Sequence, residues 1–199
     1  MATSFPDFLT RPVDEVAQRL LGCIIEREID GTIIRVRIVE TESYDQDDEA
    51  SHAYGGERIR NAVMFKKAGY LYVYFTYGMH YCCNVVTGPQ GYGSGVLIRA
   101  VEPIPGESDR EALAILSKNR RGITGVHLTN GPAKLTQALG IDMRFNGHDL
   151  HEGPIRLIVG RLRPEETIIS SPRIGISKAR DLHRRFYIKD SEFVSRKSL

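Results

Sequence analysis

The fifteen residues from Tyr70 to Asn84 constrain the fold more than any other part of the chain. They hold five of the nine tyrosines, and Gly78 divides them near the middle. Alternating aromatic residues are typical of strands with a half-buried face, and glycine supplies the positive φ that a tight turn needs. The stretch therefore predicts a β-hairpin with strands over 70–77 and 79–87. Packing alone does not require so many hydroxyl groups, because a buried phenol without a partner costs free energy.

The tip of this hairpin carries unusually large side chains. Tyr77 and Met79 flank Gly78, at a place where a turn more often has small or polar residues. Bulky side chains at an exposed tip can act as a wedge between the base pairs of a nucleic acid. An aromatic-rich hydrophobic core explains the same stretch as well, so both interpretations stay open at this point.

The rest of the chain predicts one α+β domain over residues 1–199. No segment resembles a linker, and the content of 41% hydrophobic and 26% charged residues is ordinary for a globular protein. We expect a curved, largely antiparallel β-sheet flanked by helices, from which the hairpin protrudes. The remaining expected strands cover 23–28, 33–41, 96–102, 155–159 and 186–188, and the expected helices cover 10–21, 108–117 and 133–139.

Local signals set several of these boundaries. Asp30-Gly31 predicts a tight turn between the first two strands. Thr10 is the expected N-cap of the first helix, with Pro12 in its first turn. Residues 45–67 are polar and lack periodicity, so we expect a long surface loop there, and loops of that length are often functional.

Cysteine usage and hydropathy indicate the compartment. Cys23, Cys82 and Cys83 cannot form a paired framework, and their spacing does not fit a metal site. No apolar run approaches the ~18 residues of a membrane span, and the start of the chain does not resemble a secretory signal. We expect a cytoplasmic protein, associated with the nucleoid if bacterial, with no bound metal and no contact with a membrane.

Charge is unevenly distributed although the net charge is only +2. Residues 40–49 contain six acids and no lysine or arginine, whereas residues 154–199 contain eleven basic and five acidic residues. A basic face can meet a polyanion while an acidic site lies elsewhere. Such a run is also typical of a solvated surface, so it favours nucleic-acid binding only modestly.

Two carboxylates and one guanidinium are predicted to lie on one side of neighbouring strands. Glu40 and Glu42 continue the side that the apolar residues of the strand 33–41 define, if that strand is regular. In the strand 96–102, Arg99 lies on the same side as Leu97 and Val101. Acids at the end of an apolar strand face line a pocket or form a structural ion pair, and the sequence pattern alone allows both.

Short motifs in consistent order extend over nearly the whole chain. They are Ile38-Val39-Glu40-Thr41-Glu42-Ser43-Tyr44, Asp48-Glu49-Ala50-Ser51-His52, Arg60-Asn61, Met64-Phe65, Leu71-Tyr72-Val73-Tyr74, Tyr77-Gly78-Met79, Asn84, Val96-Leu97-Ile98-Arg99-Ala100-Val101-Glu102-Pro103, Gly131-Pro132-Ala133-Lys134-Leu135 and Arg173-Ile174-Gly175. In these motifs the chain closely resembles the alkyladenine (3-methyladenine) DNA glycosylase family. The resemblance implies a monomeric, monofunctional enzyme without metal or organic cofactor. It would remove alkylated or deaminated purines, such as 3-methyladenine, 7-methylguanine, hypoxanthine and ethenoadenine, from duplex DNA.

The resemblance also implies roles for individual residues. Glu42 would activate a water molecule, which Arg99 and the backbone carbonyl near Val194 would help to hold. Tyr77 would fill the space that the extruded nucleotide leaves, with Met79 beside it. The aromatic walls of the base pocket would be Tyr44, His52 and Tyr74. Asn84 would reject normal guanine. Lys134 would contact a phosphate.

Two other classes of function remain open from the residues. One is a non-catalytic module that senses distorted DNA through the same wedge. The other is a metal-dependent nuclease that uses the acids Glu40, Glu42, Asp47 and Asp48. No lysine is placed to form a Schiff base with the sugar, so cleavage of the DNA strand after base removal is not expected.

Overall fold

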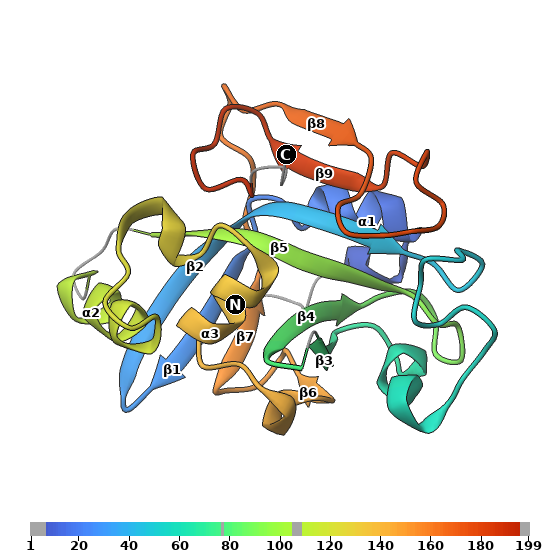
Figure 1. The fold of residues 1–199 in the computed structure, drawn as a ribbon, viewed down its shortest axis with the longest axis horizontal. Coiled ribbons are helices and arrows are strands. Elements are labelled where there is room, and N and C mark those ends of the chain that lie inside the picture. Colours follow the sequence, from blue (N-terminus) through green and yellow to red (C-terminus); the bar gives the residue numbers. More distant parts are fainter. Residues whose placement is uncertain (1–6, 77, 105–108, 196–199) are drawn as a thin grey trace.

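The computed structural model describes residues 7–76, 78–104 and 109–195. Within these residues, nine strands form a sheet in the order β6-β3-β4-β5-β2-β1-β7, and β9 joins it by pairing with β2 and with β8 (Figure 1). Each pairing among them is antiparallel. The strands are β1 Ile24–Ile29, β2 Thr32–Tyr44, β3 Tyr70–Thr76, β4 His80–Val86, β5 Gly95–Pro103, β6 His148–Asp149, β7 Ile155–Ile158, β8 Ile168–Ser171 and β9 Arg185–Ile188.

Helices cover both faces of the sheet, which confirms the predicted α+β fold. The helix α1 packs on β2 and β5 from behind in the view of Figure 1, and α3 packs on β4 and β5 from the front. A large hydrophobic core fills the space between these layers, and a smaller one lies under η2. The helices are α1 Val13–Arg19, α2 Asp109–Asn119 and α3 Pro132–Ala138, and the 3-10 helices are η1 Asp7–Thr10, η2 Ile59–Phe65, η3 Gly125–Leu128 and η4 Met143–Phe145.

The register between β2 and β5 decides which side chains face the later site. Ile38 pairs with Val101 and Glu42 pairs with Leu97, so the two pairs are four residues apart in each of the antiparallel strands. The alternation of sides is therefore preserved across a local irregularity at Glu40. Glu42 stays on the side that the apolar residues define, as the sequence predicts, and Thr41 faces the opposite side, where its hydroxyl donates to the Ala17 carbonyl of α1.

Both predicted hairpins are present. Asp30 and Gly31 have φ values of 50° and 83°, the left-handed conformation that a two-residue turn between twisted strands requires. In the second hairpin, Tyr74 pairs with Cys82, and Gly78 has φ 68°. Tyr77, the expected wedge, lies outside the described residues.

Three expectations about local structure need correction. The first helix begins later than predicted: its N-cap is Pro12, without a side-chain cap, and Thr10 belongs to η1. The Thr10 hydroxyl donates instead to the Asp7 carbonyl at 3.0 Å, so a nearer backbone group competes successfully for it. The segment 45–67 is not all loop, because η2 forms within it. The short strands β6 and β8 were not predicted, and Ser108, where the second expected helix begins, lies outside the described residues.

Within the described ranges, no helix has the length and apolar character to cross a membrane.

Candidate active site

A cavity of about 660 Å³ opens between β2, β3, β4, β5 and the two loops around residues 49–52 and 174–178. Five residues that the sequence analysis selected line it: Tyr44, His52, Tyr74, Asn84 and Arg99. They come from four strands and one loop, so only the folded sheet brings them together. Further lining residues are Glu49, Ala50, Met64, Tyr72, Thr76, Cys82, Leu97, Pro132, Ile174, Gly175, Ile176, Ser177 and Lys178.

One wall of the cavity is aromatic. The His52 and Tyr74 rings meet edge to face with their centroids 4.5 Å apart, and Tyr72 lies beside Tyr74 at 5.7 Å. The Nδ1 atom of His52 is 3.0 Å from the Tyr72 hydroxyl, which fixes the imidazole. The sequence analysis did not select Tyr72, although its place two residues before Tyr74 in a strand predicts the same side.

Asn84 closes the cavity beside this wall. Its side chain is buried, and its Nδ2 donates to the Tyr72 carbonyl at 3.3 Å. That bond fixes the amide in the strand pair of β3 and β4, so Asn84 presents a rigid edge to whatever occupies the cavity.

The wall is electrically neutral near pH 7. Burial, together with the charge of Arg60, lowers the pKa of His52, so its imidazole is uncharged above about pH 6.5. Burial, a hydrogen bond with Cys82 and neighbouring negative groups raise the pKa of Tyr74 above its ordinary value, so its phenol keeps its proton. A positively charged ligand would meet uncharged, electron-rich rings here.

Glu42 lies just behind the cavity wall and is fully buried. Its Oε2 accepts a hydrogen bond from the Tyr44 hydroxyl at 2.8 Å and is 3.2 Å from Nη1 of Arg99. Its Oε1 accepts the backbone N–H of Ile174 at 2.8 Å. All three partners line the cavity, whereas Glu42 itself does not. The carboxylate is therefore held by the wall, one side chain away from the open space.

Tyr44 is fixed from two directions. Its hydroxyl is bonded to Glu42, and the guanidinium of Arg173 lies over its ring at 4.6 Å from the centroid. Burial and the nearby charge of Glu42 raise the pKa of Tyr44, which keeps the phenol protonated as a donor. Arg173 in turn forms a fully buried ion pair with Asp48, so the loop 45–51 and the segment around 173 are locked together behind the ring.

Glu40 anchors Arg99 from the side away from Glu42. Its Oε1 is 3.0 Å from Nε of Arg99 and 2.6 Å from Nε of Arg185 in β9. Both its oxygens also accept from Ser195, one from the backbone N–H at 2.6 Å and one from the hydroxyl at 2.8 Å. Burial alone would lower the pKa of Arg99, but the two glutamates raise it overall, so the guanidinium is cationic.

The same contacts bring the C-terminal segment to the site. Nη2 of Arg99 lies 3.3 Å from the Ser195 hydroxyl, and Val194 is the preceding residue. The predicted carbonyl of Val194 is thus placed in the neighbourhood of Arg99, although no direct contact joins the two.

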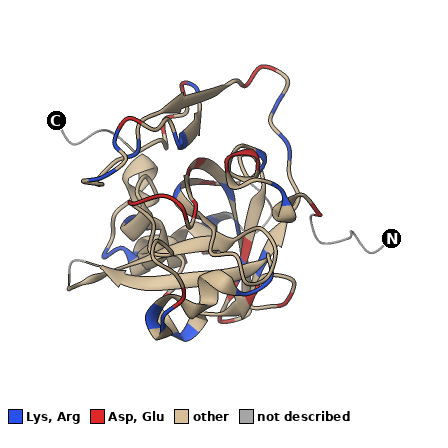
Figure 2. Ribbon diagram, turned by 90° about the vertical axis from the view of Figure 1, so that its right-hand side faces the viewer, with Lys and Arg blue, Asp and Glu red and all other residues tan. Residues whose placement is uncertain are grey.

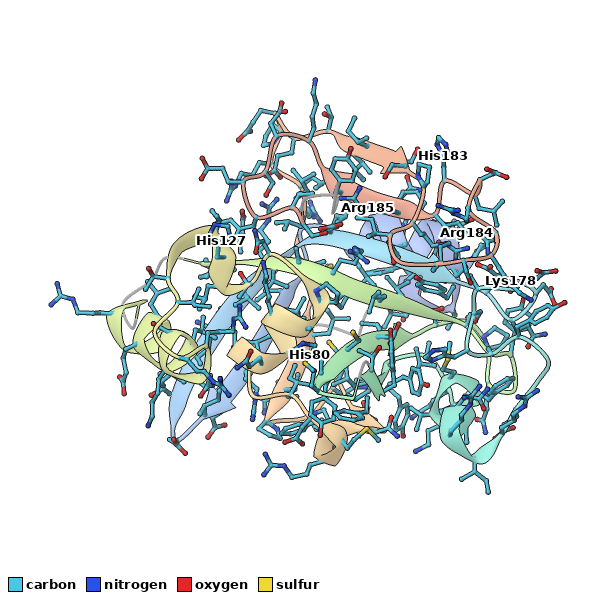
Figure 3. All side chains as sticks on the ribbon, in the orientation of Figure 1. His80, His127, Lys178, His183, Arg184 and Arg185 are labelled. Atoms are coloured by element: carbon cyan, nitrogen blue, oxygen red, sulfur yellow. The ribbon has the colours of Figure 1, made fainter. Side chains whose placement is uncertain are left out.

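The basic residues of the C-terminal region are mostly committed to ion pairs. Arg173 and Arg185 are buried against Asp48 and Glu40, so these two do not belong to a free basic surface. In Figure 2, acidic and basic segments lie next to one another along the ribbon. Lys178 differs in its exposure. It pairs with Glu49 at 3.7 Å, but its side chain is 61% exposed at the rim of the cavity and projects outward in Figure 3.

Two residues predicted to contact DNA lie near the cavity. Met79 follows Gly78 and is 70% exposed. Lys134 lies in the first turn of α3, and its Nζ donates to Asn130 at 2.7 Å. Pro132, which opens the same helix, lines the cavity, so α3 and the hairpin both reach its edge.

The acids proposed for a metal-dependent nuclease do not converge. Glu40 and Glu42 are bound by Arg99, and Asp48 is bound by Arg173. Across the described ranges, no three His, Cys, Asp or Glu side chains group in a way that could hold a metal ion.

Comparisons with known proteins agree with this geometry. The family model described as methylpurine-DNA glycosylase matches residues 7–192. A protein of Carboxydothermus hydrogenoformans named "Putative 3-methyladenine DNA glycosylase" is 49% identical over 191 residues, which cover 96% of this chain and 97% of that protein. A protein of the same name from Methanoculleus marisnigri is 45% identical over 193 residues, with the same coverage. The chain belongs to the methylpurine-DNA glycosylase family.

Proposed function

We propose that this protein turns alkylated or deaminated purine nucleotides out of duplex DNA and hydrolyses their N-glycosidic bond, leaving an abasic site. The observation that carries the proposal is the pair of Glu42 and Arg99, held by Tyr44 at the wall of an aromatic cavity. The bond cannot be reached inside the base stack, so the nucleotide must leave it, at a cost of roughly a few kcal/mol.

The cavity walls supply binding and selectivity. A flipped purine would lie against Tyr44, His52 and Tyr74, and stacking on aromatic rings contributes roughly 1–3 kcal/mol per base. A ring methylated at nitrogen carries positive charge, which neutral aromatic faces favour over an uncharged base. The rigid edge of Asn84 would crowd the exocyclic amine of normal guanine, which supports discrimination against undamaged DNA.

Hydrolysis would use a water held between the sugar and Glu42. A carboxylate offers about four lone-pair positions, and Tyr44, Arg99 and Ile174 occupy three of them. The remaining position can accept a proton from the water as its oxygen forms the new bond to C1′. The bond from C1′ to the base nitrogen is already breaking as the water approaches, and its electron pair leaves with the base. A cationic base departs as a neutral molecule and needs no acid.

The charges around this path suit the transition state. The sugar develops oxocarbenium character, which the negative charge of Glu42 stabilises. Arg99 opposite would help to orient the water together with the carbonyl of Val194. Because Glu40 holds Arg99 from the other side, the guanidinium cannot follow the water or the base.

The remaining parts of the proposal concern the DNA. Tyr77 would fill the vacated space in the stack, Met79 would pack beside it, and Lys134 would contact a phosphate. All these groups belong to one chain, which supports a monomeric enzyme. We further propose that it needs no cofactor and has no strand-cleaving activity after base removal.

The test is release of the free base from duplex oligonucleotides that each carry 3-methyladenine, 7-methylguanine, hypoxanthine or ethenoadenine. The unaltered protein should release at least the cationic bases, and Glu42→Gln should lose release by about 100-fold or more while it still binds lesion DNA. If Glu42→Gln releases bases at the normal rate, Glu42 does not activate the water. A protein that binds but releases no base under any condition would instead be a non-catalytic sensor.

A further inference from the structure

A second cleft, of about 590 Å³, shares two walls with the cavity described above. In β4, Cys82 lines the first cavity, whereas His80 and Tyr81 line the second. In α3, Pro132 lines the first and Ala133 the second. Figure 3 shows His80, the first residue of β4 after the hairpin turn, beside α3. Anything that lies across the hairpin tip therefore passes from one cavity to the other.

Two arginines at the end of α2 give this cleft its charge. Arg121 is exposed, and its side chain forms no hydrogen bond or ion pair with another described residue, whereas its backbone N–H donates to the Lys118 carbonyl. Arg120 donates through Nη1 to Gln137 at 2.6 Å, and its buried Nε has no hydrogen-bond partner in the described part of the chain. Two guanidiniums thus line one cleft without a carboxylate bound to either.

A third cation lies close by. Burial and the charge of Arg120 lower the pKa of Lys134, which shows that the two positive groups act on each other. Asp142 is the acid in the cleft lining, but Arg144 already binds both its oxygens at 2.9–3.1 Å. Among the described residues, no carboxylate is paired with Arg120, Arg121 or Lys134, and an anion would relieve their repulsion.

The rim of the cleft is apolar. Met79 is 70% exposed on the hairpin side, and Ile123 is 39% exposed on the opposite side. A groove with cations inside and apolar edges matches a chain in which phosphates alternate with sugar faces.

We propose that this cleft binds the phosphodiester backbone of DNA next to the damaged nucleotide, with Arg120 and Arg121 contacting phosphates. The inference rests on the proposed function, because it is the lesion in the first cavity that would place duplex DNA across the hairpin. Duplex DNA carries a phosphate about every 3.4 Å along each strand, so the backbone supplies anions wherever the duplex continues past the tip. The phosphates can come from the lesion strand or from the opposite strand.

The test compares the salt dependence of binding to duplex DNA for matched variants. Each phosphate contact contributes about 0.9 to the slope of log K against log salt concentration. Arg121→Gln should lower the slope by about one and raise Kd by about three- to tenfold at moderate salt, and Arg121→Lys should restore most of the slope. Arg19→Gln removes the same charge from α1, on the opposite face of the sheet, and should change neither.

Methylphosphonate substitutions then identify the strand. Single phosphates near the lesion are replaced, in one strand at a time. At one position the replacement should weaken DNA binding by the unaltered protein and leave the Kd of Arg121→Gln unchanged. If Arg121→Gln keeps the full slope, or behaves like Arg19→Gln, the inference is wrong. Base release by the unaltered protein is measured alongside. Its absence, together with an Arg121-dependent slope, would overturn the proposed enzyme and leave the binding cleft standing.

Discussion

Tyr44 joins the binding of a base to the chemistry that would act on it. Its ring lines the cavity and its hydroxyl is bonded to Glu42, so one side chain sets the position of both. The guanidinium of Arg173 covers one ring face at 4.6 Å, which leaves the rest of the ring to the cavity. Removing the hydroxyl while keeping the ring separates the two roles.

We expect Tyr44→Phe to slow base release more than it weakens lesion binding. Glu42 loses one of its donors, and a hydrogen bond to a charged group contributes about 1.5–3 kcal/mol, which corresponds to roughly a tenfold or larger fall in rate. Single-turnover excision and Kd for the same lesion duplex measure the two effects. Equal loss in both would show that the hydroxyl serves only the shape of the cavity.

His52 makes the site sensitive to acid. Burial and Arg60 lower its pKa below the ordinary value of about 6.5, so the ring is neutral at neutral pH and gains a proton only in more acidic solution. The protonated ring would repel a cationic base. Excision of 7-methylguanine should therefore fall more steeply than that of neutral hypoxanthine as the solution becomes acidic, and His52→Gln should remove the difference.

The same group affects stability with a defined sign. The unfolded chain binds a proton at His52 from about pH 6.5 downward, whereas the folded protein resists it. The contribution of neutral His52 to folding is therefore complete above about pH 6.5 and declines as the pH falls below that value. Denaturant unfolding of the protein and of His52→Gln at pH 7 and pH 5 measures this difference.

Glu40 connects four elements of the chain: β2, β5, β9 and the segment that ends at Ser195. Arg99, Arg185 and Ser195 all bind this one fully buried carboxylate. The segment 191–195 is therefore held at the site by its contact with Glu40 rather than by a helix or strand of its own. A loss of Glu40 should disturb Arg99 and Val194 together.

We expect Glu40→Ala to destabilise the fold by about 3–5 kcal/mol, because it leaves the buried guanidinium of Arg185 without its carboxylate and that of Arg99 with Glu42 alone. Glu15→Ala is the matched control, since its partner Arg19 is 52% exposed and such surface pairs contribute only about 0–1 kcal/mol. Urea unfolding of both variants compares them. A cost for Glu40→Ala no larger than that for Glu15→Ala would show that the buried arginines find other partners.

For the molecule as a whole, the acids of the site are neutralised by arginines. Glu40 is paired with Arg99 and Arg185, Glu42 with Arg99, and Asp48 with Arg173, so each of these carboxylates already has a guanidinium partner within the protein. Base release should therefore continue at an unchanged rate in excess EDTA. Activity that disappears with the chelator and returns with a divalent cation would favour the metal-dependent alternative.

Patterns between neighbouring residues predicted most elements of the fold. Asp30-Gly31 indicated its turn because few residues adopt a positive φ easily, and the alternation around Arg99 indicated its side because a strand has a period of two. Thr10 was misassigned as a cap because its hydroxyl had a closer backbone partner. The strand β8 was missed because it is short and pairs at the edge with β9.

The sequence by itself indicated seven of the nine strands, both hairpins and, through the resemblance, several residues that line the cavity. It did not indicate that Ile174 would donate its N–H to Glu42, 132 residues away, or that Arg185 and Ser195 would meet Glu40. A buried, paired arginine and an exposed, unpaired one look alike in a sequence, because burial and pairing depend on distant strands. Only the tertiary structure decided which charges are neutralised at the site and which, such as that of Arg121, remain free of a partner among the described residues.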